Sequence, residues 1–214
     1  MTVVPLSYQL CGWIPAWWRG TAGGDDLLEL LGSQALARAS ELRASVTALT
    51  AYSPELGVGV LPGPKPATEA AVAAGQAVIL HGGVGEPATL LIPAADGWEF
   101  LPAAPPRPVD LDLRQAAADF AEAVVIAEHE LRSTGTSFDQ PVAQMSVRPL
   151  PPGADAERKG VLVRAVRVWS AVAAVPPARR SPALADVVTA SARAALAAYT
   201  EPVVSAPARS RRFA

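Results

Sequence analysis

His81 stands next to a pair of glycines at the end of an apolar run, as His81-Gly82-Gly83. A loop of this kind can supply backbone amides for an oxyanion hole in lipase-like hydrolases. That reaction also needs a nucleophilic serine in a G-x-S-x-G turn, and the sequence has none. Gly83-Val84-Gly85 and Gly57-Val58-Gly59 lack the third glycine of a dinucleotide-binding fingerprint, and no phosphate-binding G-x-x-x-x-G-K-[ST] run occurs. We therefore interpret the glycines as turn residues and keep His81 as a pocket candidate.

The second histidine, His129, lies in an acidic stretch that the sequence predicts to be helical. Asp119 and Glu122 are three residues apart, and His129 follows Glu122 by two helical turns. Its neighbours Glu128 and Glu130 point about 100° away from it on a helix, so the three cannot grip one ion. A metal or acid–base site would need groups from a second element. We keep Glu122 and His129 as pocket candidates, favour a solvated polar face, and expect neither a metal nor a cofactor.

Three of the five tryptophans fall within six residues near the N-terminus, at Trp13, Trp17 and Trp18. Tryptophan is enriched at interaction hot spots, so this group is a candidate surface for a protein partner. The alternative is an N-terminal flap whose indoles cover the core, and we favour that interpretation.

Charge is distributed unevenly along the chain. Residues 1–143 carry 7 basic and 16 acidic side chains, net −9, whereas residues 144–214 carry 11 and 4, net +7. Such asymmetry can mark a surface for nucleic acid, but packing of the two halves against each other explains it as well. No sequence-reading motif accompanies the basic half, so nucleic acid is the less favoured partner. Its basic residues are Arg148, Arg158, Lys159, Arg164, Arg167, Arg179, Arg180, Arg193, Arg209, Arg211 and Arg212.

A predicted helix over residues 109–132 would position these groups. Its apolar residues recur at steps of three and four, which is typical of one buried stripe. Asp112 can cap its start with Gln115 as partner, and Gly135 offers a stop. Val125 and Ile126 widen the stripe, so we expect a helix covered on more than one side, forming a shared wall between a sheet and later helices. The stripe comprises Leu113, Ala117, Phe120, Val124, Ala127 and Leu131.

The remaining elements are predicted from hydrophobic periodicity and from the residues that typically begin or end helices and strands. Asp25 or Asp26 can start a helix that Gly32-Ser33 interrupts before a second piece at 34–44. Strand-like runs follow at 46–51, 56–61, 78–80, 89–92 and 98–101, with a short helix at 67–74 ended by Gly75 and a hairpin at Asp96-Gly97. Residues 161–175 fit a strand by composition, but the spacing of Arg164 and Arg167 favours a helix. Ser181-Pro182 predicts the start of a last helix, which ends before Pro202.

The predicted fold is α+β, with N-terminal helices and a small mixed or antiparallel sheet followed by a C-terminal set of three helices. We divide the chain into residues 1–104, residues 105–202 and a disordered basic tail at 203–214, the first two forming one cooperative unit. The order of ATEAAVAAGQAVILHGG, ATLLIPAADGWEFLP, DLDLRQAAADFAEAV and RKGVLVRAVRVWSAV resembles a family of uncharacterised actinobacterial proteins. The resemblance covers about residues 25–200; it implies that residues 156–175 are helical and supplies no site.

The amino-acid composition limits which classes of function are possible. One cysteine excludes an internal disulfide framework and a cysteine-cluster metal site. We see neither a signal peptide nor an apolar run of membrane-spanning length, so we expect a cytoplasmic protein. The missing nucleophile, phosphate-loop and metal patterns favour a non-catalytic interaction or accessory protein with an unknown protein partner. The alternatives are an enzyme or small-molecule binder with a pocket between sheet and helices, and non-specific nucleic-acid binding.

Overall fold

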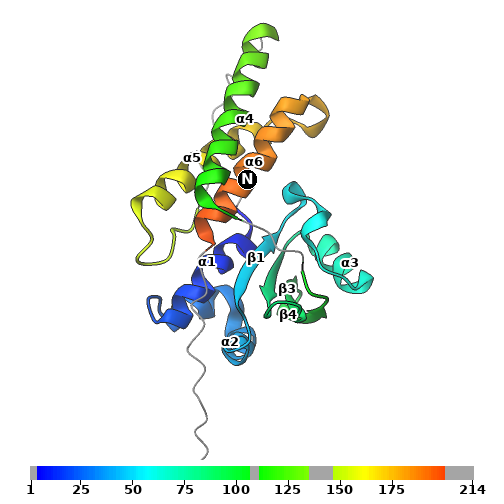
Figure 1. Ribbon diagram of the computed structural model, residues 1–214, viewed down its shortest axis with the longest axis vertical. Coiled ribbons are helices and arrows are strands. Elements are labelled where there is room, and N and C mark those ends of the chain that lie inside the picture. Colours follow the sequence, from blue (N-terminus) through cyan, green and yellow to red (C-terminus); the bar gives the residue numbers. More distant parts are fainter. Residues whose placement is uncertain (1–3, 107–110, 135–146, 201–214) are drawn as a thin grey trace, which may run out of the picture.

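The α+β architecture is confirmed by a computed structural model, which describes residues 4–106, 111–134 and 147–200. Over these residues two N-terminal helices lead into a four-stranded sheet, and three long helices follow it (Figure 1). Gly135 and the predicted tail at 203–214 lie outside the described residues. Within the described ranges, no helix has both the length and the apolar character that crossing a membrane requires.

The N-terminal segment is a helix, α1 (Leu6–Arg19), and not a covering flap. Nearly all of its side chains are buried, including the polar Ser7 and Gln9. It contacts α2 (Gly24–Leu42), the first two strands of the sheet and the last helix of the chain. The helix contains Pro15, and the contacts that bury it come from segments far along the chain, so the sequence pattern did not reveal it.

Helix α2 has the interruption that the sequence predicts. Gly32 has φ 75° and ψ 166°, a non-helical conformation that separates two helical pieces. Only glycine adopts this region without strain, so the predicted break at Gly32-Ser33 is confirmed. Leu27, Leu30 and Leu31 of the first piece are buried.

The sheet is an antiparallel meander, in the order β1 (Ala48–Tyr52), β2 (Ala77–His81), β3 (Ala88–Ala94) and β4 (Gly97–Ala103). The hairpin at Asp96-Gly97 is confirmed, with Ala94 paired to Gly97. Side chains of β2 alternate between faces: Val78 and Leu80 join the core that contains α1, whereas Ile79 joins a smaller core with α3 (Lys65–Ala74). The predicted run at 56–61 is not a strand but two short 3₁₀ turns, η1 (Pro54–Leu56) and η2 (Val58–Val60).

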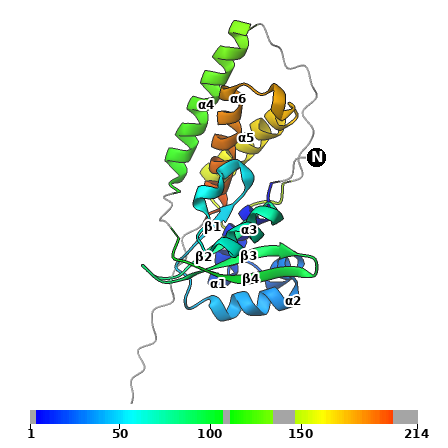
Figure 2. The same cartoon turned by 90° about the vertical axis from the view of Figure 1, so that its right-hand side faces the viewer.

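The last three helices are α4 (Leu113–Thr134), α5 (Ala156–Ala173) and α6 (Pro182–Tyr199). The helical prediction for 161–175 is thus confirmed. The predicted caps form as well: the Gln115 amide donates to Asp112 Oδ1 at 2.8 Å, and the Leu184 amide donates to Ser181 Oγ at 3.3 Å. Figure 2 shows α4, α5 and α6 grouped on one side of the sheet region, with α2 on the opposite side.

The prediction that α4 forms the wall between sheet and helices is wrong. Helix α4 packs mainly on α6, and α1 instead joins the sheet to α6. Val125 and Ile126, expected to be covered, are 65% and 54% exposed. The physical reason is that α4 buries a narrow face, which includes Ala116, Phe120 and Ala127, and leaves the rest of its circumference open.

Candidate functional site

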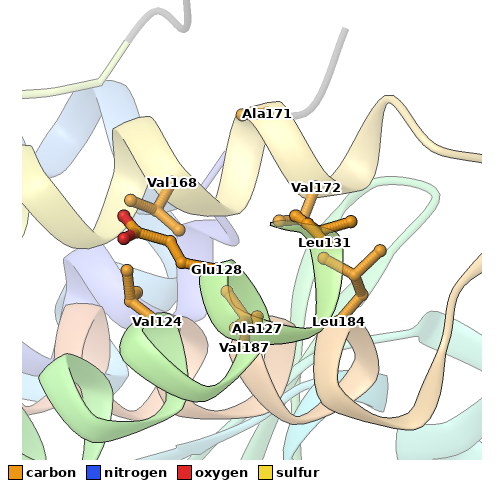
Figure 3. Close-up of a pocket in the computed structure, with 9 residues that line it drawn as sticks. All are labelled: Val124, Ala127, Glu128, Leu131, Val168, Ala171, Val172, Leu184 and Val187. Atoms are coloured by element: carbon orange, nitrogen blue, oxygen red, sulfur yellow. The ribbon is translucent and has the colours of Figure 1, made fainter. Parts of the chain in front are cut away.

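An apolar groove runs between α4 and α5, with α6 as its floor (Figure 3). Helices α4 and α5 touch each other little, because each rests on α6. The groove has a volume of about 210 Å³. Its lining consists of Val124, Ala127, Glu128 and Leu131 of α4, Val168, Ala171 and Val172 of α5, and Leu184 and Val187 of α6.

The groove is open to solvent. Val124 and Leu131 on α4, like Val168 and Ala171 on α5, remain partly exposed. Next to this lining, Val125 lies on the exposed surface of α4, and Ile126 lines a second hollow on the other side of the same helix. The middle turn of α4 therefore carries apolar side chains around its whole circumference. A solvated helix normally presents polar residues on its outer face, so this turn is a notable apolar surface among the C-terminal helices.

The two helices that form the sides of the groove carry opposite charge. Helix α4 has four acidic and two basic residues, net −2, and α5 has one acidic and four basic, net +3. A contact between Arg114 Nε and Glu157 Oε1, 3.9 Å apart, links their first turns. Farther along, Glu122 on α4 and Lys159, Arg164 and Arg167 on α5 are exposed and form no ion pair with described residues.

The chemistry that the groove offers is apolar contact. Glu128 is the one ionisable residue among the nine that line it, and its Oε2 accepts a hydrogen bond of 3.1 Å from Arg132 Nη2. General acid–base catalysis needs at least one positioned group free to exchange a proton with a substrate. The lining is better suited to receiving the apolar face of another helix.

His81 lies at the end of β2, far along the chain from this groove. Its Nε2 is 2.6 Å from Thr50 Oγ1, and burial lowers its pKa below the ordinary value of 6.5. The adjacent glycines form a tight turn, in which the Gly83 amide donates to Glu86 Oε2 at 2.9 Å. The interpretation of these glycines as turn residues agrees with this geometry.

Glu122 and His129 are exposed side chains of α4. Glu122 lines the shallow hollow beside Ile126, together with Asp119 and Asp186. In the described parts of the chain, no three His, Cys, Asp or Glu side chains are placed so that they could share a metal ion. Glu122 and His129 share α4 and His81 ends β2, so the three pocket candidates do not form one site.

The tryptophan group is part of the core. Trp13 and Trp18 are each 5% exposed, and Trp17 packs against the same core. Trp13 Nε1 donates to the Pro149 carbonyl at 3.2 Å. Cys11 is buried beside them, and burial raises the pKa of its thiol, which keeps it protonated and unreactive. Trp13 and Trp18 therefore leave little surface for the partner contact considered for them, whereas Trp17 is only partly buried.

Part of the basic half is used within the fold. The Arg148 guanidinium lies over the Trp13 ring, 5.2 Å from its centroid, and its Nη2 is 3.0 Å from Glu29 Oε2. Arg180 donates to the carbonyls of Ala173 and Val175 at the end of α5. The contacts of Arg148 with Trp13 and Glu29 agree with the interpretation that the oppositely charged halves pack on each other.

Sequence reasoning did not find the groove. The signal was the uninterrupted run Val124-Val125-Ile126-Ala127, which is apolar on every side of a helix. Such a run predicts either complete burial within the chain or a surface that another molecule covers, and the sequence alone does not distinguish the two.

No family model matches the chain, and no significant match was found among curated proteins or among solved structures. The resemblance to actinobacterial proteins stays a prediction. Any inference about function therefore has to come from the geometry.

Proposed function

We propose that this chain is a non-catalytic interaction protein that assembles through the groove between α4 and α5. The observation that carries the proposal is the exposed middle turn of α4 beside an open apolar groove. Exposed apolar surface of this kind is costly in water, and covering it with another helix recovers about 25 cal/mol for each Å² buried. Helix-in-groove docking is a common way of meeting that need.

The occupant that we propose is a second copy of the chain. Helix α4 has an exposed apolar turn with acidic flanks, and α5 borders the groove with exposed basic residues. In a two-fold dimer, each contact between α4 of one copy and α5 of the other occurs twice. The net charges of −2 on α4 and +3 on α5 then attract in both contacts, which steers association and fixes the orientation of the copies.

A charge-exchange experiment tests this arrangement. One variant carries Glu122→Lys with Glu128→Lys on α4, and the other carries Arg164→Glu with Arg167→Glu on α5. Each variant alone places like charges across both contacts, which costs several kcal/mol. We expect each to sediment as a monomer and an equimolar mixture to form a heterodimer.

Stability of the variants is the control. All four substituted side chains are exposed, so the melting temperature of the monomeric variants should stay close to that of the parent protein at low concentration. Variants that dimerise as readily as the parent, or a mixture that stays monomeric, would contradict a contact between α4 and α5. A parent chain that never dimerises would refute the choice of occupant.

We further propose that the assembly operates in the cytoplasm. The chain has a single cysteine, which lies buried in α1, so an oxidising compartment has no internal disulfide to form. Fractionation of cells that produce the protein, followed by detection with an antibody, tests the location. Recovery in a secreted or envelope fraction would contradict it.

A further inference from the structure

A second pocket lies where the sheet meets the helices. Strand β1 contributes Thr50, η1 contributes Leu56, and α6 contributes Thr189, Arg193 and Leu196 to a cavity of about 220 Å³. This volume is below the range of about 300–1,000 Å³ that is typical of drug-sized ligands. The pocket is open to solvent, since Thr189 and Arg193 are exposed, and its volume suits a ring or short chain with one polar group.

Arg193 supplies the charge of this pocket. It has no hydrogen bond or ion pair within the described residues, unlike Arg148, Arg158 and Arg180, which are engaged in the fold. No carboxylate lines the described wall of the pocket to neutralise it. A guanidinium presents a planar fork of donors that matches a carboxylate with two parallel hydrogen bonds.

Two threonine hydroxyls lie with Arg193 in the lining. Thr189 precedes Arg193 by four residues, which places both on the same face of α6. Thr50 is nearly buried, and its Oγ1 is hydrogen-bonded to His81 Nε2 at 2.6 Å. If His81 donates in that bond, the Thr50 hydroxyl proton is available to a ligand in the pocket. The rest of the lining is apolar, including Leu56 and Leu196.

We propose that this pocket binds a small carboxylate with a hydrocarbon body about the size of one ring. Arg193 holds the carboxylate, the threonine hydroxyls orient it, and the leucine side chains contact the hydrocarbon. A single guanidinium balances the single charge of a carboxylate, which favours that anion over a phosphate ester. This inference is independent of the groove, which lies at another place on α6 and contains neither Arg193 nor either threonine.

The test is calorimetric titration of the full chain with benzoate, benzamide and phenyl phosphate. Benzoate should bind best, and benzamide should bind about ten- to hundredfold more weakly, because it lacks the charge-assisted contact with Arg193. Arg193→Gln should reduce the affinity for benzoate by the same factor and leave benzamide unchanged. Arg43→Gln, an exposed change at the end of α2 in a residue that lines neither the groove nor the pocket, is the matched control and should bind benzoate like the parent.

A second variant guards against an indirect effect of the Arg193 substitution. Thr189→Asp places a carboxylate in the pocket wall one turn before Arg193 on α6, where it can pair with Arg193 and repel benzoate. Because Thr189 is exposed, binding should be lost while the melting temperature is retained. Equal binding of benzoate by the parent and Arg193→Gln would overturn the proposal. Tighter binding of phenyl phosphate than of benzoate would also overturn it. So would a failure of all three carboxylates, benzoate, hexanoate and cyclohexanecarboxylate, to bind the parent chain.

Discussion

Gly12 lies where α1 crosses the end of α6, and its replacement by alanine is expected to destabilise the fold. A Cβ atom at this position would lie 2.7 Å from the carbonyl oxygen of Tyr199 and 3.4 Å from the Pro151 ring. The carbonyl belongs to backbone, so relief of the contact requires one helix to move. Overpacking of this kind costs about 1–3 kcal/mol, and we expect the upper end because two helices and a proline ring enclose the site.

The helix propensity of alanine works in the opposite direction. Alanine favours a helix interior by about 1 kcal/mol over glycine, which leaves a net loss of about 2 kcal/mol for Gly12→Ala. For a chain of this length, that loss lowers the melting temperature by about 4–8 °C. The matched control is Gly160→Ala in α5, where a Cβ atom would meet nothing within 4 Å. The control should raise the melting temperature by about 2–4 °C.

Thermal and urea unfolding of the two variants separate these effects, since the same substitution in two helices should shift stability in opposite directions. Because α1 is the element that joins the sheet to α6, Gly12→Ala also probes whether the two parts unfold together. A Gly12→Ala protein as stable as the parent would refute the close packing of α1 on α6. A second unfolding transition in that variant would contradict the expected cooperative unit.

Three further substitutions test other parts of the structure. Burial lowers the pKa of His81, so the unfolded chain binds its proton first and stability falls as the pH drops below about 6.5. His81→Gln should flatten that fall in urea titrations, and equal profiles for the variant and the parent would contradict the burial. Ser181→Ala should cost about 1 kcal/mol in the free energy of unfolding, because it removes the cap of α6, and an unaltered urea midpoint would argue against that cap. Tyr199→Phe removes a hydrogen bond of 2.5 Å to the Arg148 carbonyl and should cost about 0.5–1.5 kcal/mol by the same assay, whereas a gain in stability would be inconsistent with it.

The elements that sequence predicted well are those with local signals. The break at Gly32, the hairpin at Asp96-Gly97 and the cap at Ser181 each depend on one or two residues with restricted backbone preferences. Periodicity likewise located α4 and its start at Asp112. These features are fixed within a few residues of chain, so they can be inferred without knowing the tertiary contacts.

The features that sequence missed depend on contacts between distant segments. Helix α1 contains Pro15, a residue that usually breaks a helix, and the contacts that bury it come from distant segments. The sequence predicts Val125 and Ile126 to be buried, because nothing in their own segment shows that α6 covers only one face of α4. The pocket around Arg193 joins α6 to β1 and η1, which lie more than 120 residues earlier in the chain, so no spacing pattern could bring its residues together.

The most direct test of assembly through the groove is sedimentation equilibrium of the parent chain and two aspartate variants over a range of concentrations. Val125→Asp places a charge on the exposed turn of α4, whereas Val84→Asp makes the same change at a fully exposed position in the turn between β2 and β3. The parent and Val84→Asp should approach twice the chain mass of 22.1 kDa, and Val125→Asp should stay at 22.1 kDa. A parent chain that stays at 22.1 kDa throughout, or a Val125→Asp variant that dimerises like the parent, would contradict the proposal.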